Sequence, residues 1–323
     1  MDELKKKISE NPILYAVIRK IYHCFVFAIS VLAKFLTLLQ TINGYIIAKL
    51  VFMTTPANMF YNNYYTDTII TEKLNYGKSQ LKVRVNTYWD QYRIADFETY
   101  PVDVLIKDIE ANTQNKKIVY YEVGANIGYS ALVLADRLAE KGSVYALEVE
   151  PTNFKTLCDN IILNKIDNLV PFNLGVSKQA KVSKFYYNVY HTEMHKSLPV
   201  SGMGAHSLNF DQNLHDKKVY CNVPLIPLDT LISTFGLEKP THVFIDTHGA
   251  ELEVIESMSS TLVDDDLVKI MVDIEEEGID DVKDSKIYKK LTNAGFDISH
   301  CETQVASGPF TANSHRTVFE KRK

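Results

Sequence analysis

Short, mostly apolar runs alternate with amphipathic segments from residue 117 onward, and this alternation constrains the fold more than any other feature of the sequence. Runs such as residues 118–122 and 241–246 are typical of strands that a parallel sheet buries on both faces. Strands that alternate with helices predict an α/β fold with a doubly wound, mostly parallel sheet that is covered by helices.

The elements can be assigned from hydrophobic periodicity and from turn residues. We expect strands at residues 82–88, 118–122, 142–148, 168–174, 241–246 and 267–273, and a closing hairpin of residues 296–302 and 316–320. We expect helices at residues 101–110, 127–141, 152–164, 250–261 and 284–294. Residues 182–226 are expected to form a strand-rich insertion around a loop.

Residues 12–53 precede this pattern and are apolar with few charges. At 100° per residue, polar side chains fall on one stripe: Arg19, His23, Ser30, Lys34, Thr37 and Thr41. The stripe favours an amphipathic helix on a membrane surface within an N-terminal apolar helical extension, residues 1–53. A membrane span would bury Lys34 near the bilayer centre at a cost of about 3 kcal/mol. A span, or a helix packed on the domain or on a partner subunit, remains an alternative.

The rest of the chain divides into two parts. Residues 54–111 form an aromatic-rich bridging segment, and residues 112–323 form the main domain. The formal net charge of −5 argues against a protein that binds nucleic acid, which needs a concentrated basic surface. The four cysteines are far apart and form no CxxC pair, which is typical of a reducing compartment. We therefore expect a cytoplasmic protein that is peripheral to, or anchored in, a membrane.

The first strand of the main domain runs into a glycine-containing turn, Glu122-Val-Gly-Ala-Asn-Ile-Gly128. Gly124 permits a tight turn and a close approach of the backbone to a ligand. The sequence is not the dinucleotide pattern GxGxxG, because its third and sixth positions are Asn126 and Tyr129. Glu122 suits an ammonium group and would repel a pyrophosphate. The turn therefore favours S-adenosyl-L-methionine over NAD(P) as the cofactor.

The second strand ends at Glu148, which follows Gly124 by 24 residues. An acid at this position of a nucleotide-binding sheet accepts hydrogen bonds from ribose hydroxyls. The turn and the acid occur in the order and at the spacing that an adenosine-containing cofactor requires. Together they predict a cofactor site at the carboxyl ends of the first two strands.

Four ordered motifs make residues 121–258 resemble the FkbM family of methyltransferases. They are Glu122-Val-Gly-Ala-Asn-Ile-Gly-Tyr-Ser130, Val144-Tyr-Ala-Leu-Glu-Val-Glu-Pro151 with Asn153 and Asn160, Pro227-Leu-Asp-Thr-Leu-Ile232, and Phe244-Ile-Asp-Thr-His-Gly-Ala-Glu-Leu-Glu-Val254. The resemblance implies a Rossmann-like class I methyltransferase that uses S-adenosyl-L-methionine. It also implies transfer to a hydroxyl oxygen of a small-molecule or glycan acceptor, such as a sugar, glycolipid or natural product.

The same resemblance assigns roles to individual residues. Glu122, Gly124, Asn126 and Gly128 would hold the methionine end of the cofactor, and Glu148 would hold the ribose. This chain departs from the family pattern at two positions. Glu122 stands where the family usually has Asp, and Asp246-Thr-His-Gly249 stands where it usually has Asp-Val-Glu-Gly. The second departure lies where the acceptor reacts, so the acceptor class does not carry over with the resemblance.

A hydroxyl acceptor must lose its proton around the transition state, so a nearby base assists methyl transfer. His248 is the first candidate for this base, because imidazole titrates near neutral pH. Asp246 is a candidate to orient the base or to approach the sulfonium. His206, in the loop Gly202-Met-Gly-Ala-His-Ser-Leu208, is the second candidate base. A histidine at position 248 that only holds the loop is the competing interpretation.

We expect no metal at this site. His191, His195 and His206 match no zinc-ligand spacing. A magnesium ion shared by Asp246 and Asp273 at neighbouring strand ends is an alternative, because carboxylates suit this ion. Otherwise the acidic run at residues 273–277 is expected to be a solvated strand exit. The alternatives for function are N-methylation of an amino group, a non-catalytic cofactor-binding module and an NAD(P)-dependent oxidoreductase.

Overall fold

The computed structural model describes residues 65–72, 81–87, 100–111, 116–186, 220–275, 281–304 and 314–322. The chain divides into two units, Met1–Leu50 and Val51–Lys323, and every described residue belongs to the second unit. The amphipathic helix expected within residues 1–53 therefore lies outside the described residues. Within them, no helix combines the length and the apolar character that a membrane crossing requires.

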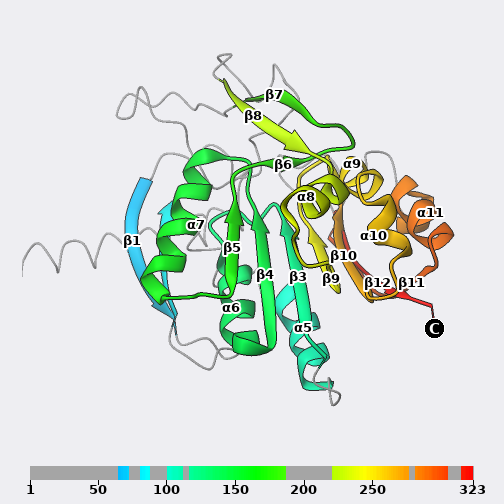
Figure 1. Ribbon diagram of the computed structural model, residues 1–323, viewed down its shortest axis with the longest axis horizontal. Coiled ribbons are helices and arrows are strands. Elements are labelled where there is room, and N and C mark those ends of the chain that lie inside the picture. The colour runs from blue at the N-terminus through cyan, green and yellow to red at the C-terminus, as the bar shows by residue number, and fades with distance from the viewer. Residues whose placement is uncertain are drawn as a thin grey trace, which may run out of the picture. The chain divides into compact units, whose positions relative to one another are not determined.

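A seven-stranded sheet forms the centre of the second unit, in the order β11-β12-β10-β9-β3-β4-β5 (Figure 1). Its strands are β3 (Ile118–Val123), β4 (Gly142–Leu147), β5 (Leu169–Phe172), β9 (His242–Ile245), β10 (Lys269–Ile274), β11 (Phe296–Gln304) and β12 (Ser314–Lys321). The pairs from β5 through β10 are parallel, and β12 is antiparallel to both of its neighbours. This topology confirms the predicted α/β, doubly wound sheet and its closing hairpin.

Helices pack on both faces of this sheet. Successive residues of β3 point to opposite faces, so Ile118 and Tyr120 lie in one buried cluster while Val119 and Tyr121 lie in the other. The first cluster includes side chains of α5 (Tyr100–Ala111), α6 (Tyr129–Leu138) and α7 (Pro151–Asn164). The second includes side chains of α8 (Leu228–Phe235), α9 (Glu251–Glu256), α10 (Ser259–Val263) and α11 (Lys286–Asn293). Two short 3-10 helices, Ala139–Lys141 and Val282–Asp284, follow α6 and precede α11.

The order of the strands fixes where a ligand binds. The chain builds β4 and β5 on one side of β3 and then crosses to build β9 and β10 on the other side. The strand order therefore reverses between β3 and β9. In open α/β sheets, ligands bind outside the carboxyl ends of the strands at this switch point.

The residues before α5 contribute an antiparallel pair, β1 (Tyr65–Glu72) and β2 (Leu81–Thr87). Strand β2 confirms the strand predicted at residues 82–88, and its Val83 and Val85 are fully buried in the core with α6 and α7. Asn160 of α7 accepts the N–H of Arg84 (2.6 Å) and donates to its carbonyl (3.1 Å). Asn164, one turn later, makes the same pair of bonds with Lys82. The two amides therefore pair with β2 as a neighbouring strand would.

The insertion after β5 forms a small sheet of β6 (Gly175–Val176), β7 (Lys181–Tyr186) and β8 (Tyr220–Ile226). This confirms its strand-rich character at both ends. Residues 187–219 between β7 and β8 lie outside the described residues, and His206 is among them.

The structure differs from the sequence prediction at residues 250–261, where two helices replace one. Ser257 ends α9, and its Oγ donates to the carbonyl of Val254 (2.7 Å) and accepts the N–H of Leu228 (3.2 Å). Asp229 of α8 then accepts the N–H groups of Ser260 (2.6 Å) and Thr261 (3.0 Å) at the start of α10. Helix α8 is not among the helices expected from the sequence. Its residues Leu228 and Asp229 make the hydrogen bonds at the break between α9 and α10.

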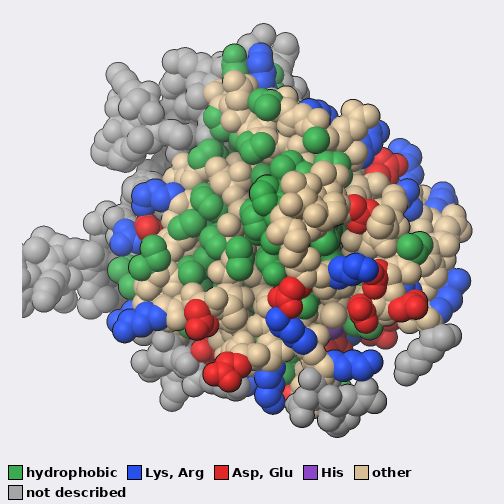
Figure 2. All heavy atoms as spheres, viewed as in Figure 1, with side chains coloured by type: hydrophobic (Ala, Val, Ile, Leu, Met, Phe, Trp, Pro, Cys, Tyr) green, Lys and Arg blue, Asp and Glu red, His purple; other side chains and the backbone are tan. Residues whose placement is uncertain are grey.

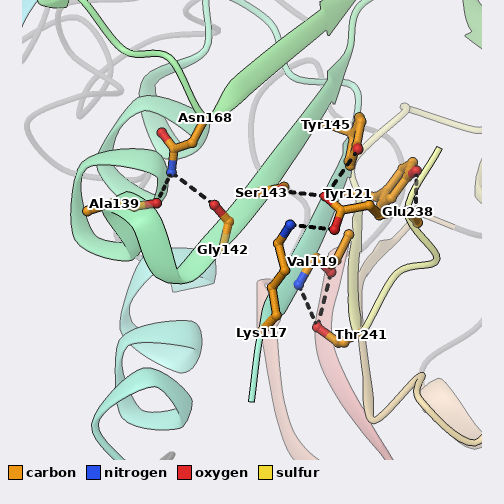
Figure 3. A network of polar contacts seen from close by, with 10 residues as sticks. All are labelled: Lys117, Val119, Tyr121, Ala139, Gly142, Ser143, Tyr145, Asn168, Glu238 and Thr241. Atoms are coloured by element: carbon orange, nitrogen blue, oxygen red, sulfur yellow. Dashed lines mark hydrogen bonds and ion pairs between the residues drawn. The ribbon is translucent and has the colours of Figure 1, made fainter. Parts of the chain in front are cut away.

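A polar network ties together the amino ends of β3, β4 and β9, at the edge opposite the switch point (Figure 3). The carboxylate of Glu238 accepts hydrogen bonds from Lys117 Nζ (2.5 Å) and Ser143 Oγ (2.6 Å). The backbone carbonyl of Glu238 accepts one from the hydroxyl of Tyr121 (2.7 Å), whose ring stacks on Tyr145. Lys117 and Ser143 together lower the pKa of Glu238. This edge is held by contacts within the chain.

Apolar side chains gather on the face that carries β5 and α8 (Figure 2). Val170 of β5 is 40% exposed and Phe235 at the end of α8 is 58% exposed. The ring of Phe235 lies 6.3 Å from that of Phe172.

Candidate functional site

The turn after β3 is held by the ends of the two neighbouring strands. The N–H groups of Gly124 and Ala125 both donate to the carbonyl of Leu147 at the end of β4 (2.9 and 3.0 Å). On the other side, the N–H of Asp246 donates to the carbonyl of Val123 (3.0 Å). Gly124 has φ +91°, and a Cβ at this residue would lie 1.8 Å from the carbonyl oxygen of Asp246. The predicted need for glycine therefore has two causes, the backbone conformation and the adjacent strand.

The next two residues of the motif have different surroundings. Asn126 adopts the left-handed conformation (φ 51°), and its side-chain oxygen is buried without a hydrogen-bond partner in the described part of the chain. Gly128 has φ +84°, and a Cβ there would lie 2.2 Å from Cδ1 of Leu157 in α7. A residue with a Cβ at position 128 would therefore be strained by this φ and would press on the Leu157 side chain of α7. Asn126, by contrast, presents a polar atom at the turn.

Glu148 lies directly beside this turn, at the end of β4. Its side chain is buried, and its two oxygens accept the N–H groups of Asn126 and Glu150, each at 2.7 Å. Burial raises the pKa of Glu148 to about 7, the two N–H donors oppose this rise, and the charges of Glu150 and Asp246 add to it. A carboxylate oxygen has two lone pairs, so each oxygen can accept a further bond from a ribose hydroxyl.

Glu122 is buried beneath the turn. Its Oε1 accepts a hydrogen bond from the hydroxyl of Ser130 in the first turn of α6. Burial and the adjacent Glu122 raise the pKa of Tyr120 well above its ordinary value of 10.0, so this phenol stays protonated. Glu122 is therefore buried and hydrogen-bonded to α6, and its predicted contact with the cofactor's ammonium group remains a prediction.

His248 lies in the loop after β9, in the left-handed conformation (φ 50°). Its Nδ1 is 3.1 Å from each carboxylate oxygen of Glu275, and its Nε2 is 3.8 Å from Oδ1 of Asp246. The imidazole thus lies between two carboxylates from the ends of adjacent strands. The closer partner is Glu275 and not Asp246, and no sequence motif pointed to it.

Asp273, near the end of β10, and Glu275, directly after β10, are largely buried, so these two members of the acidic run are not the solvated strand exit that the sequence predicts. Their side chains are only 12% and 25% exposed. Asp273 accepts a hydrogen bond from the hydroxyl of Ser314 and lies 3.7 Å from Nε of Arg316. Burial and the charge of Asp246 raise the pKa of Asp273. No set of three potential metal ligands occurs among the described residues, where Asp273 is engaged by Ser314 and Arg316.

Glu251, in the first turn of α9, is a second residue of this loop that was not predicted from the sequence. Its buried Oε1 accepts the N–H of Gly249 (2.8 Å) and the hydroxyl of Thr247 (3.0 Å). Burial raises the pKa of Glu251 to about 7, against the hydrogen bonds that it accepts from the backbone. Glu251 therefore holds the loop on both sides of His248.

The structure brings the predicted cofactor residues and Asp246 and His248 together at the carboxyl edge of β3, β4 and β9. His206 lies outside the described residues. The edge is acidic: the charge of Asp246 raises the pKa of both Glu148 and Asp273. Such an edge favours a ligand that carries positive charge. A doubly wound sheet with a glycine turn at its switch point and an acid after the next strand defines an α/β enzyme that binds a nucleoside-containing cofactor.

The chain belongs to the methyltransferase FkbM domain family, which residues 122–298 match. The cofactor of this family is S-adenosyl-L-methionine. The match runs from the end of β3 to the start of β11 and therefore contains the turn, Glu148 and the His248 loop.

Two relatives of known activity are similar to parts of the chain. The hexuronic acid methyltransferase AglP of Haloferax volcanii is 25% identical over 144 residues, which are 45% of this chain and 51% of AglP. The tRNA(Phe) (4-demethylwyosine(37)-C(7)) aminocarboxypropyltransferase of Methanocaldococcus jannaschii is 40% identical over 57 residues, which are 18% of this chain and 22% of that enzyme. The chain thus spans about half the length of AglP and less of the tRNA enzyme.

A similar solved structure is an FkbM methyltransferase from Methylobacillus flagellatus. It has 12% sequence identity and a TM-score of 0.39, over 64% of this chain and 44% of that one.

Proposed function

We propose that this chain transfers the methyl group of S-adenosyl-L-methionine to a hydroxyl oxygen of a sugar, glycolipid or natural-product acceptor. One observation carries the proposal: the buried carboxylate of Glu148 is hydrogen-bonded to the backbone of the glycine turn at the switch point of the sheet. Membership in the family supports the methyl transfer. The similarity to AglP, a hexuronic acid methyltransferase, supports a sugar as the acceptor.

The residues of the turn fit the cofactor. We assign the methionine end to Glu122, Gly124, Asn126 and Gly128, and the ribose to Glu148. The buried side-chain oxygen of Asn126 has no partner in the described residues and suits an N–H donor such as the cofactor's ammonium group. The acidic edge also suits a cation, because the sulfonium and the ammonium are both positively charged.

When bound, the cofactor supplies an electrophilic methyl group. The contribution of the protein is to align the acceptor oxygen with this methyl group and to remove the proton of the hydroxyl. His248 is the base in this proposal, since it lies in the loop after β9, at the same edge of the sheet as the turn. A positioned base of this kind contributes roughly 10²–10⁴-fold to a rate.

N-methylation of an amino group is a second candidate, and the carboxylates around His248 favour it. Asp246 and Glu275 flank the imidazole at 3.8 and 3.1 Å and would attract an ammonium acceptor. His248 would then remove a proton from nitrogen before the transfer.

The cofactor assignment is tested by calorimetric titration of the full chain with S-adenosyl-L-methionine. Glu148→Ala should weaken binding by about 10- to 100-fold, since it removes hydrogen bonds to a charged acceptor. Glu140→Ala changes an exposed acid after α6 and should leave the affinity unchanged. NAD serves as a second control. Binding of NAD instead would favour the oxidoreductase, and equal affinities of the two variants would refute the ribose assignment.

The acceptor class is tested with S-adenosyl-L-methionine that carries a labelled methyl group. Methyl glycosides of a neutral hexose, a hexuronic acid and an amino sugar are compared as acceptors. Label on oxygen supports the proposal, and label on nitrogen supports the second candidate. Tight cofactor binding without transfer to any of the three would favour a non-catalytic binding module.

We also propose that residues 12–53 bind a membrane surface as an amphipathic helix, because their polar side chains fall on one stripe. The full chain should sediment with liposomes that contain anionic lipid, and carbonate should release it. Resistance to carbonate would indicate a membrane span instead.

A further inference from the structure

The His248 imidazole is held by a residue to which nothing in the sequence motifs assigns a role. Both carboxylate oxygens of Glu275 lie 3.1 Å from Nδ1 of His248, so the carboxylate straddles this ring nitrogen. The two side chains are 28% and 25% exposed. They come from the loop after β9 and from the residue after β10, which are parallel neighbours in the sheet.

We infer that Glu275 is a positioning residue that keeps His248 in the tautomer with its proton on Nδ1, so that Nε2 is the atom that accepts the proton of the methyl acceptor. This inference rests on the proposed function. An ionised carboxylate accepts hydrogen bonds and donates none. The 3.1 Å contacts therefore require the proton on Nδ1, and a neutral imidazole then carries its lone pair on Nε2.

The loop itself is held by other contacts. Glu251 accepts hydrogen bonds from Gly249 N–H and Thr247 Oγ1, on either side of His248. His248 has φ 50°, a conformation that non-glycine residues adopt at some cost and that is frequent at functional sites. Because Glu251 fixes the backbone, removal of the Glu275 carboxylate should change the ring's tautomer while the loop stays in place.

The second carboxylate near the ring has a different relation to it. Oδ1 of Asp246 is 3.8 Å from Nε2, beyond hydrogen-bond distance. Asp246 therefore leaves Nε2 as the acceptor and lies where it can stabilise the ring once Nε2 is protonated. The two carboxylates flank one imidazole, but only Glu275 selects the tautomer.

Methyl transfer to the hydroxyl moves one electron pair to sulfur and one proton to His248. The acceptor oxygen forms a bond to the methyl carbon as the carbon–sulfur bond breaks, and the electron pair of that bond stays on sulfur. The hydroxyl proton passes to Nε2, while Nδ1 keeps its proton and its bond to Glu275. The imidazolium that results faces carboxylates at both nitrogens and later returns its proton to solvent.

The test uses the full chain with ¹⁵N-labelled histidine and needs no acceptor. Nitrogen–proton correlation spectra at a pH of about 8, where histidine is ordinarily neutral, report which ring nitrogen carries the proton. His248→Gln identifies the His248 signals. We expect His248 to be in the Nδ1–H form in the unmodified chain. In Glu275→Leu, the Nδ1–H fraction should fall roughly twofold or more, because its acceptor is lost.

The control is Glu256→Leu, which removes a carboxylate at the end of α9 whose ion pair is with Lys178. It should leave the His248 tautomer unchanged. An Nε2–H ring, or a doubly protonated ring, in the unmodified chain would overturn the inference, even if Glu275→Leu did not fold. An unchanged tautomer in a folded Glu275→Leu would overturn it as well. Titration with S-adenosyl-L-methionine distinguishes failure of the proposed function from failure of the Glu275 inference. If the unmodified chain does not bind the cofactor, the proposed function is refuted. The tautomer of His248 is measured without the cofactor, so its result tests the Glu275 inference separately.

Discussion

Replacing Gly124 by alanine tests whether the turn after β3 is built around the carbonyl of Asp246. The new Cβ would lie 1.8 Å from this oxygen, so the two backbones would have to separate by more than about 1 Å. Overpacking of this kind costs about 1–3 kcal/mol. The left-handed conformation of Gly124 (φ +91°) adds about 1–2 kcal/mol for any residue with a Cβ.

Gly236 provides the matched control, because it has φ +60° at the end of α8, but a Cβ added there would have nothing within 4 Å. Gly236→Ala should therefore cost only the conformational part, about 1–2 kcal/mol. For a domain of this size, 1 kcal/mol corresponds to about 2–4 °C in Tm. The two variants then differ by the overpacking cost alone, so Gly124→Ala should melt about 2–12 °C below Gly236→Ala in thermal unfolding followed by circular dichroism.

Gly124→Ala should also weaken S-adenosyl-L-methionine binding roughly tenfold or more, because it moves the turn after β3 at the switch point of the sheet, where the cofactor binds. Gly236→Ala should leave the affinity unchanged. If the two variants melt within about 1 °C of each other and bind the cofactor equally well, the reasoning from the Asp246 carbonyl is refuted.

Two further predictions concern buried polar groups. Asn160→Leu removes three hydrogen bonds to backbone groups and should cost about 3 kcal/mol or more in urea unfolding. Asn164→Leu, at a more exposed position, should cost about 1 kcal/mol, and equal costs would refute the role of burial. Glu148 and Glu251 have pKa values raised from 4.5 to about 7, so the folded state binds protons more tightly than the unfolded state. Their stabilising contribution is full below pH 4.5 and is lost as the pH rises through about 7, by about 3 kcal/mol for each group. Urea midpoints of the ligand-free protein should therefore fall between about pH 5 and pH 8, and Glu148→Gln should flatten this fall; an unchanged pH dependence would contradict the assignment.

The sheet could be predicted from the sequence because each central strand is a short apolar run with its own signal. The place of Glu148 was equally predictable, since an acid directly after the second strand lies at the carboxyl edge in any doubly wound sheet. Glu275 was not predictable in this way. Its contact with His248 depends on the parallel register of β9 and β10 and on the left-handed backbone of His248, and neither leaves a local signal.

The helices show the same limit of prediction from sequence. The break between α9 and α10 comes from α8, whose Asp229 and Leu228 bond to residues about 30 positions further along the chain. Contacts over such separations do not alter local periodicity, so the sequence of this region predicts one helix.

The bonds between α7 and β2 have a consequence for where this protein can be truncated. The family match begins at residue 122, but a folding unit that begins there would lack the strand to which Asn160 and Asn164 are bonded. Asn160 also donates a hydrogen bond to the carbonyl of Ile127, inside the cofactor turn. Loss of β2 would therefore disturb the position of this turn and weaken cofactor binding. A truncated protein that starts after residue 87 should therefore bind S-adenosyl-L-methionine poorly, although it retains every residue of the family motifs.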